Sequence, residues 1–180
     1  MSVATQQQWI IDPTHSEVYF KVKHMMVSTV TGSFASFEGS LSADGEGFEG
    51  ASVSFSAEVA SLYTNNAQRD EHLKSADFFD AANHPQLSFA STAFKATGED
   101  TYTLSGILSI RGIEKPVSLN VVHHGTAVDP YGQTKAGFEI TGTILRKDFG
   151  LAWDAVTEAG NVVVSNEVRL SLNVQLTKQV

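Results

Sequence analysis

The longest alternation of apolar and polar side chains in this sequence lies in residues 162–177. Even-numbered positions from Val162 to Leu176 are apolar except Asn166, and odd-numbered positions from Ser165 onward are polar. Successive side chains of a β-strand point to opposite faces, whereas on a helix these residues would scatter around the cylinder. We therefore predict one long strand with a dry face and a wet face.

Shorter stretches elsewhere repeat this pattern. Short connections rich in Gly, Asp and Pro join several of them, which predicts an antiparallel meander. So many strands need protected edges, and closure into a barrel removes edges altogether. We predict an all-β barrel, with a two-sheet sandwich as the alternative. The alternating segments are residues 17–23, 52–59, 102–110, 117–121 and 138–144, and the extended segments with less decided faces are 30–42 and 86–95.

Composition restricts the classes of function. A chain of 180 residues fits one domain, residues 1–180, of which about 1–8 are predicted to form a flexible tail. The net charge of −8 argues against nucleic acid, which requires a basic surface. No apolar run is long enough to span a bilayer, so no integral membrane segment is expected. The N-terminus lacks the features of a signal peptide, so we expect a cytoplasmic protein, or a periplasmic one if a signal has been removed.

One mixed-charge segment, residues 64–80, interrupts the β pattern. Asn65 or Asn66 could cap a short helix there. On that helix Arg69 and His72 share a face, and Asp70 lies on a neighbouring one. The three side chains could form ordinary ion pairs or hold a polar head group, and the residues alone favour neither. A second interruption, residues 146–160, is another candidate for a mouth or plug of a barrel.

Motifs for catalysis or metal binding are absent from the sequence. There is no cysteine, no Gly-x-Ser-x-Gly motif and no His spacing typical of a metal site. We expect no catalytic residue, cofactor or metal.

Motifs spread along most of the chain resemble those of the YceI-like family of polyisoprenoid-binding proteins. The run from Arg69 to Asp80 is the most specific of them. Others are the groups Trp9-Ile10-Ile11-Asp12, Phe20-Lys21-Val22-Lys23-His24, Val30-Thr31-Gly32-Ser33-Phe34 and Arg146-Lys147-Asp148-Phe149-Gly150. The resemblance implies an eight-stranded antiparallel lipocalin-like barrel with one or two short helical segments and a hydrophobic channel. It also implies non-catalytic binding, for transport or sequestration, of a polyprenyl quinone or polyprenyl phosphate.

Strand parity and this resemblance together predict the ligand-binding residues. Arg69, Asp70 and His72 are assigned to the head-group end. Parity alone does not distinguish a packed core from a channel, and the resemblance favours a channel. The expected partner is an isoprenoid lipid, and a homodimer is allowed. Two alternatives stay open: an enzyme that acts on a prenyl lipid with Asp70 and His72 as acid and base, and a stress-related interaction module whose lipid is incidental. The predicted channel residues are Phe20, Val22, Phe55, Leu73, Phe78, Phe79, Phe89, Leu104, Leu108, Phe138, Val168, Leu170 and Leu172.

Overall fold

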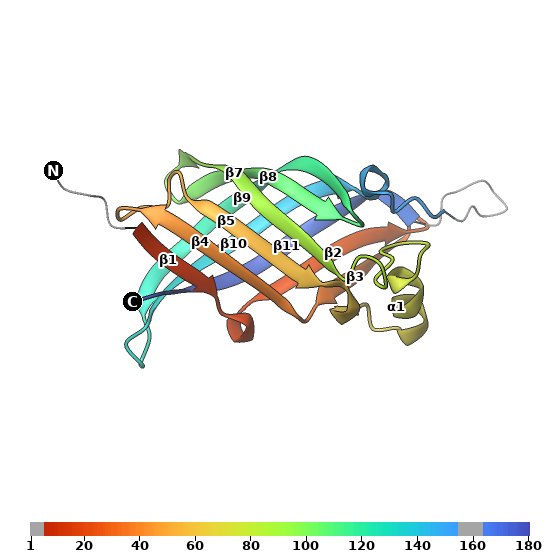
Figure 1. The fold of residues 1–180 in the computed structure, drawn as a ribbon, viewed down its shortest axis with the longest axis horizontal. Coiled ribbons are helices and arrows are strands. Elements are labelled where there is room, and N and C mark those ends of the chain that lie inside the picture. Colours follow the sequence, from red (N-terminus) through yellow and green to blue (C-terminus); the bar gives the residue numbers. More distant parts are fainter. Residues whose placement is uncertain (1–5, 155–163) are drawn as a thin grey trace.

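The computed structural model describes residues 6–154 and 164–180, and its strands form one continuous antiparallel sheet closed on itself (Figure 1). The strands are β1 (Gln6–Ile11), β2 (Glu17–His24), β3 (Ser28–Phe34), β4 (Phe37–Asp44), β5 (Ser52–Glu58), β6 (Leu62–Tyr63), β7 (Gln86–Gly98), β8 (Thr101–Ile110), β9 (Ile113–Val128), β10 (Thr134–Leu145) and β11 (Val164–Lys178). The helical elements are η1 (Pro13–His15), η2 (Val59–Ser61), α1 (Ala67–Lys74) and η3 (Arg146–Phe149).

Short breaks divide three of the long strands into the smaller pieces. β1 and β2 both pair with β11, through Ile11 opposite Leu176 and Val18 opposite Leu172, so they form one strand interrupted by η1. β4 and β3 pair with β1 and β2 in the same way, and β5 and β6 continue that arrangement. Each long strand then pairs with its neighbours in sequence, and β11 closes the ring onto β1. The predicted eight-stranded antiparallel barrel is confirmed, and the sandwich alternative is wrong.

The break in the first strand is built around Asp12. Its Oδ1 accepts hydrogen bonds from Thr14 N at 3.0 Å and Thr14 Oγ1 at 2.7 Å, which caps η1 with Pro13 at its start. Its Oδ2 lies 2.9 Å from His15 Nδ1 and 3.2 Å from Lys135 Nζ. These hydrogen bonds, led by that of Thr14, hold the pKa of Asp12 well below its ordinary value.

The N-terminal prediction needs a correction. Gln6 and Gln8, predicted to lie in a flexible tail, belong to β1 and face Asp44 and Ser42 of β4. Backbone ladders form whatever the side chains are, and three successive glutamines carry no alternating pattern that would reveal a strand. Residues 1–5 of the predicted tail lie outside the described part of the chain.

The two ends of the barrel carry different structures. At one end, which we call the lid end, lie the β2–β3 hairpin tip, the β8–β9 turn, η3 and the long connection from β6 to β7 that contains α1 (Figure 1). We call residues 64–85 of that connection the lid. Asn66 caps α1 by accepting a hydrogen bond from Arg69 N at 3.0 Å, as the sequence predicted for this position or its neighbour. The far end carries Gln6, Lys178 and the β4–β5 connection (Figure 1).

Candidate binding cavity

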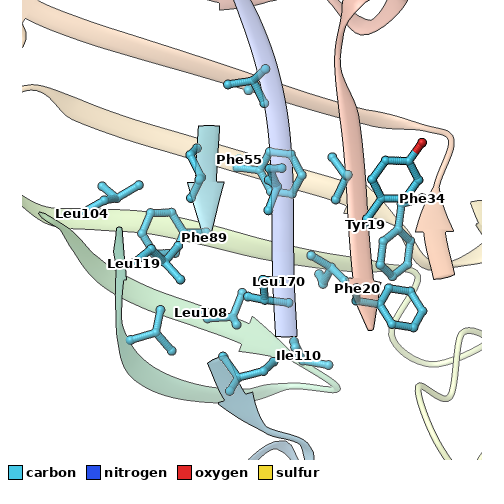
Figure 2. Close-up of a pocket in the computed structure, with 18 of the residues that line it drawn as sticks. Tyr19, Phe20, Phe34, Phe55, Phe89, Leu104, Leu108, Ile110, Leu119 and Leu170 are labelled. Carbon is cyan, nitrogen blue, oxygen red and sulfur yellow. The ribbon is translucent and has the colours of Figure 1, made fainter. Parts of the chain in front are cut away.

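The barrel encloses a cavity of about 210 Å³ whose wall is almost entirely apolar. Figure 2 shows aromatic and aliphatic side chains converging on it from strands around the ring, among them Phe20, Phe55 and Phe89. Along β11 the wall runs from Val164 to Leu176, which corresponds to roughly 40 Å of extended chain. A small volume spread over such a length describes a narrow channel rather than a wide bowl.

Every residue predicted for the channel lies on this wall. Strands β2, β5, β7, β8, β10 and β11 contribute ten of them, and the lid contributes Leu73, Phe78 and Phe79. As contacts to a ligand they stay predictions. The ten strand residues are Phe20, Val22, Phe55, Phe89, Leu104, Leu108, Phe138, Val168, Leu170 and Leu172.

Glycines among the inward-facing positions let large side chains lie against the wall. Gly32 on β3 faces Phe20 across the ladder, and Gly142 on β10 lies against Leu119. A Cβ on Gly32 would stand 2.1 Å from the Phe20 ring, and a Cβ on Gly142 would stand 2.4 Å from the Leu119 side chain. Only glycine, which has no Cβ, avoids these clashes. These glycines therefore keep wall residues out of the middle of the channel.

The far end of the barrel is filled by aromatic side chains. Phe48, in the connection between β4 and β5, packs its ring 5.5 Å from Trp9 and 5.1 Å from Phe138. His123 stacks on Phe138 at 4.9 Å. The buried Trp9 Nε1 has no hydrogen-bond partner among the described residues. With this end filled, the lid end is the side on which a ligand can enter.

The face of the lid that points into the barrel is apolar and mostly aromatic. Leu73, Phe78 and Phe79 line the cavity at the lid end, and the ring of Phe79 meets Phe34 edge-on at 6.1 Å. Phe34 in turn packs 5.6 Å from Phe20. The lid thus continues the apolar wall, and a chain-like molecule entering here would pass between phenylalanine rings.

Arg69 and Asp70, predicted for the head-group end, do not line the cavity and direct their polar atoms at Thr64. The buried Asp70 carboxylate accepts hydrogen bonds from the backbone N, at 2.9 Å, and the hydroxyl of Thr64. Arg69 Nε donates to Thr64 Oγ1 at 2.8 Å, and its Nη2 donates to the carbonyl of the same residue. In this structure the two side chains fix the entry of the chain into α1.

His72, the third residue of that group, also lies off the cavity wall. Its Nε2 lies 2.9 Å from Asp77 Oδ2, and its ring meets Trp153 edge-on at 4.7 Å and Phe78 at 5.2 Å. His72 therefore packs behind Phe78 and joins the lid to the segment that follows η3. The imidazole and the Asp70 carboxylate therefore have different hydrogen-bond partners.

Arg146 has the most extensive hydrogen bonding at the lid end. This residue is 3% exposed and contributes to the cavity wall. Its guanidinium donates to the carbonyls of Leu151, Trp153, Val164 and Ser165 and to the Asp154 carboxylate. Guanidinium has five N–H groups, and these five acceptors use all of them. Arg146 therefore neutralises the Asp154 carboxylate and holds residues 151–154 and 164–165 in place. It has no free donor to offer to the cavity.

Asp154 also binds Lys147, whose Nζ lies 2.6 Å from its Oδ2. The hydrogen bonds from Lys147 and then from Arg146 lower the pKa of Asp154 below its ordinary value. The carboxylate therefore stays charged near neutral pH. A further arginine, Arg111, donates from Nη1 to the carbonyls of Phe78, at 2.9 Å, and Gly150, at 3.2 Å, and so connects the lid to η3.

Sequence reasoning singled out the 146–150 segment but missed Arg146 and Arg111 as organising residues. Most of their acceptors are backbone carbonyls, which every residue type carries. No sequence motif therefore indicates the roles of these two arginines. Among the described residues, no group of three or more His, Cys, Asp or Glu is placed to hold a metal ion. No helix in residues 6–154 and 164–180 has the length and apolar character needed to cross a bilayer.

Comparison with known proteins shows the same architecture in relatives. A UPF0312 protein of Azotobacter vinelandii is 37% identical over 178 residues, covering 98% of this chain and 90% of the relative. The crystal structure of BcnA from Burkholderia cenocepacia superposes with a TM-score of 0.80 at 22% identity, covering 92% of this chain and 98% of that one. A polyisoprenoid binding domain from Saccharophagus degradans gives a TM-score of 0.70 at 17% identity, covering 95% and 98%. At these identities both structures show the fold alone.

The family model of the YceI-like domain matches residues 9–176, which include every strand from β2 to β10, the second half of β1 and most of β11. The match agrees with the resemblance inferred from the Arg69–Asp80 run. The chain therefore belongs to the YceI-like family.

Proposed function

We propose that this protein binds, and carries or sequesters, a long-chain amphipathic isoprenoid lipid, without catalysing a reaction on it. The observation that carries the proposal is the narrow apolar channel along the barrel axis, filled at the far end and covered by phenylalanines at the lid end. The Saccharophagus degradans domain of the same fold is described as polyisoprenoid binding, which supports this class of ligand.

The channel suits an unfunctionalised hydrocarbon tail. Each isoprene unit transferred from water gains roughly 3–4 kcal/mol, at ~0.8 kcal/mol per carbon. Ordering a flexible tail and losing its free motion offset much of that gain. A net affinity therefore requires several units, which matches a wall that extends from Val164 to Leu176.

The head group belongs at the lid end, outside the apolar wall. An anionic phosphate drawn into the channel would need a paired cation, because an uncompensated buried charge is strongly unfavourable. Arg146 is the charged residue on the wall, and its donors are already engaged. This arrangement favours a polyprenyl quinone, or a polyprenyl phosphate whose phosphate stays in water.

The same contacts support a non-catalytic role. Asp70 and His72, the residues considered for acid–base work, hold Thr64 and Asp77 within the lid. A general acid or base must instead reach a reacting atom within hydrogen-bond distance. Here both groups act on the lid, which we assign to retaining the ligand.

Solvent extraction of natively purified protein followed by mass spectrometry tests the proposal. We expect close to one long isoprenoid per chain, and its mass identifies the head group as quinone or phosphate. Protein that is repeatedly empty, and that also takes up no added polyprenyl compound, would contradict the proposal. Turnover of a polyprenyl substrate that is lost in His72→Ala would contradict its non-catalytic part.

A further inference from the structure

The tip of the β2–β3 hairpin exposes three consecutive apolar side chains. Met25, Met26 and Val27 are 42%, 69% and 80% exposed, and they follow directly on His24, which faces Ser28 across the hairpin. Figure 1 shows this hairpin at the lid end of the barrel. Single exposed apolar residues are normal on protein surfaces, whereas a contiguous group of exposed apolar side chains marks an interaction site.

The backbone of the tip makes these residues more unusual. Met25 and Met26 have φ angles of 49° and 58°, in the left-handed region that favours Gly, Asn and Asp. The other non-glycine residues with positive φ in the described part of the chain are polar: Asn65, Asp80, Asp100 and Arg111. Two large apolar residues in a strained, solvent-facing turn oppose both folding and solubility. Such an outlier points to a function of the turn.

The apolar tip is continuous with the cavity wall. Val22 of β2 and Val164 of β11 both line the cavity, and Val164 faces His24 across the β11–β2 ladder. The wall therefore reaches the ladder position immediately before Met25. A hydrocarbon chain leaving the channel beside β2 would meet the tip before it met water.

Basic side chains flank the tip on the outer face of the barrel. Lys21 and Lys23 are exposed on β2, and Arg169 of β11 lies directly opposite Lys21. Like charges facing each other across a ladder are unfavourable without a counter-charge. None of the three forms an ion pair within the described residues, and Glu167 is the exposed acid nearest to them along β11. Three basic residues against one acid leave this face locally positive in a chain of net charge −8.

We propose that Met25, Met26 and Val27, together with Lys21, Lys23 and Arg169, form a docking surface for anionic phospholipid membrane. The apolar tip inserts at the boundary between head groups and acyl chains, and the basic residues face the lipid phosphates. Docking in this orientation brings the lid end against the bilayer. Its purpose as a route for lipid transfer rests on the proposed function, but docking itself is measured without any ligand in the channel.

Sedimentation of the 180-residue chain with vesicles tests the surface. We expect binding to phosphatidylcholine vesicles that contain phosphatidylglycerol, weaker binding to pure phosphatidylcholine, and loss of binding as salt screens the charges. The double variant Met26→Gln/Val27→Ser should bind about 10- to 100-fold more weakly, since each lost apolar contact is worth up to about tenfold. Lys21→Gln/Lys23→Gln/Arg169→Gln should remove the preference for phosphatidylglycerol.

A matched control lies at the far end of the barrel, where Val128 and Tyr131 are also strongly exposed. Val128→Ser/Tyr131→Ser should bind vesicles within about twofold of the unchanged protein, and thermal unfolding should show all variants folded. Equal binding of the tip variant and the unchanged protein would overturn the proposal. A second result would also overturn it: a dimer of the unchanged protein that the tip variant converts to monomer, with vesicle binding unaltered. The tip would then hold two copies together. Neither result affects the extraction experiment, so the two proposals fail separately.

Discussion

The ring of Phe20 lies against the α-carbon of Gly32 on the neighbouring strand, so closely that a Cβ on Gly32 would stand 2.1 Å from the ring's Cζ. This contact turns a large side chain along the wall rather than into the lumen. Phe20 also packs on Phe34, and Phe34 on Phe79 of the lid. The width of the channel below the lid therefore depends on the absence of one methyl group.

Alanine at the inward glycines should have graded effects. Gly32→Ala must move the Phe20 ring, and we expect about 1–3 kcal/mol of destabilisation and a smaller binding capacity. Gly106→Ala should cost more, because its Cβ would stand 2.4 Å from the backbone oxygen of Ala90 and the strands would have to shift. Gly39→Ala is the matched control, since its nearest atom is 3.4 Å away. Urea unfolding measures the loss of stability of each variant. A Gly39→Ala protein destabilised as much as Gly106→Ala would contradict this prediction.

Arg146→Met should be the most destabilising single change at the lid end. It removes the Arg146 hydrogen bonds to four backbone carbonyls and to Asp154 Oδ1, and we expect a loss of about 3–5 kcal/mol. Arg146→Lys should recover only part of this, because an ammonium has three donors where the site uses five. Arg169→Met, an exposed arginine on β11, serves as the control for stability. Urea unfolding measures the difference. If the unfolding midpoint of Arg146→Met equals that of Arg169→Met, the assigned role of Arg146 is refuted.

Asp70→Ala separates a lid-ordering role from contact with a ligand. Removing the carboxylate leaves the Thr64 backbone N–H and the Thr64 O–H without their acceptor, which we expect to loosen the lid by about 1–3 kcal/mol. Hydrogen exchange should then accelerate in residues 64–85 and not in β8 or β9. Ligand should dissociate faster, while one molecule per chain still binds. Unchanged exchange in the lid combined with lost binding would instead assign Asp70 to the head group, as the sequence first suggested.

Acid sensitivity should depend on Asp12. Because the folded state depresses the pKa of Asp12, its contribution is complete above the ordinary value of 3.8 and is lost as pH falls below it. Asp12→Asn should therefore lower stability at neutral pH by about 1–2 kcal/mol and lose less between pH 4 and pH 2 than the unchanged protein. Thermal unfolding across that range checks the slope. Parallel curves for the two proteins would contradict the assignment.

Much of the barrel could be predicted because its information is local. In β11 each residue from Val168 to Leu176 reveals its face by its polarity, and Phe20, Phe55 and Leu104 follow the same rule on other strands. The alternation fixes which side chains face inward. It cannot show that they leave a channel, since that depends on where rings such as Phe20 turn.

The lid was harder to predict because polarity and spacing do not reveal which groups its charged side chains bind. The order of residues from Arg69 to His72 indicates a helix with a charged face. It does not indicate that Arg69 and Asp70 both form hydrogen bonds with Thr64. The role of Arg146 depends on carbonyls contributed by residues up to 19 positions away. β1 was missed at its start because Gln6 and Gln8 pair through their backbone alone.

The central claim is that the channel holds one isoprenoid chain, and filling the channel tests it most directly. Leu172 lines the cavity on β11, and its neighbour Ser171 faces the other side of the strand. Leu172→Trp should remain folded, with about 1–3 kcal/mol of strain, and lose the ligand, whereas Ser171→Trp should keep it.

Native mass spectrometry of delipidated protein with a series of polyprenyl alcohols is that measurement. We predict one alcohol per chain in the unchanged protein and in Ser171→Trp, with affinity rising with chain length until the channel is filled, and no adduct in folded Leu172→Trp. Equal adducts in the three proteins, or none in the unchanged protein, would contradict the account.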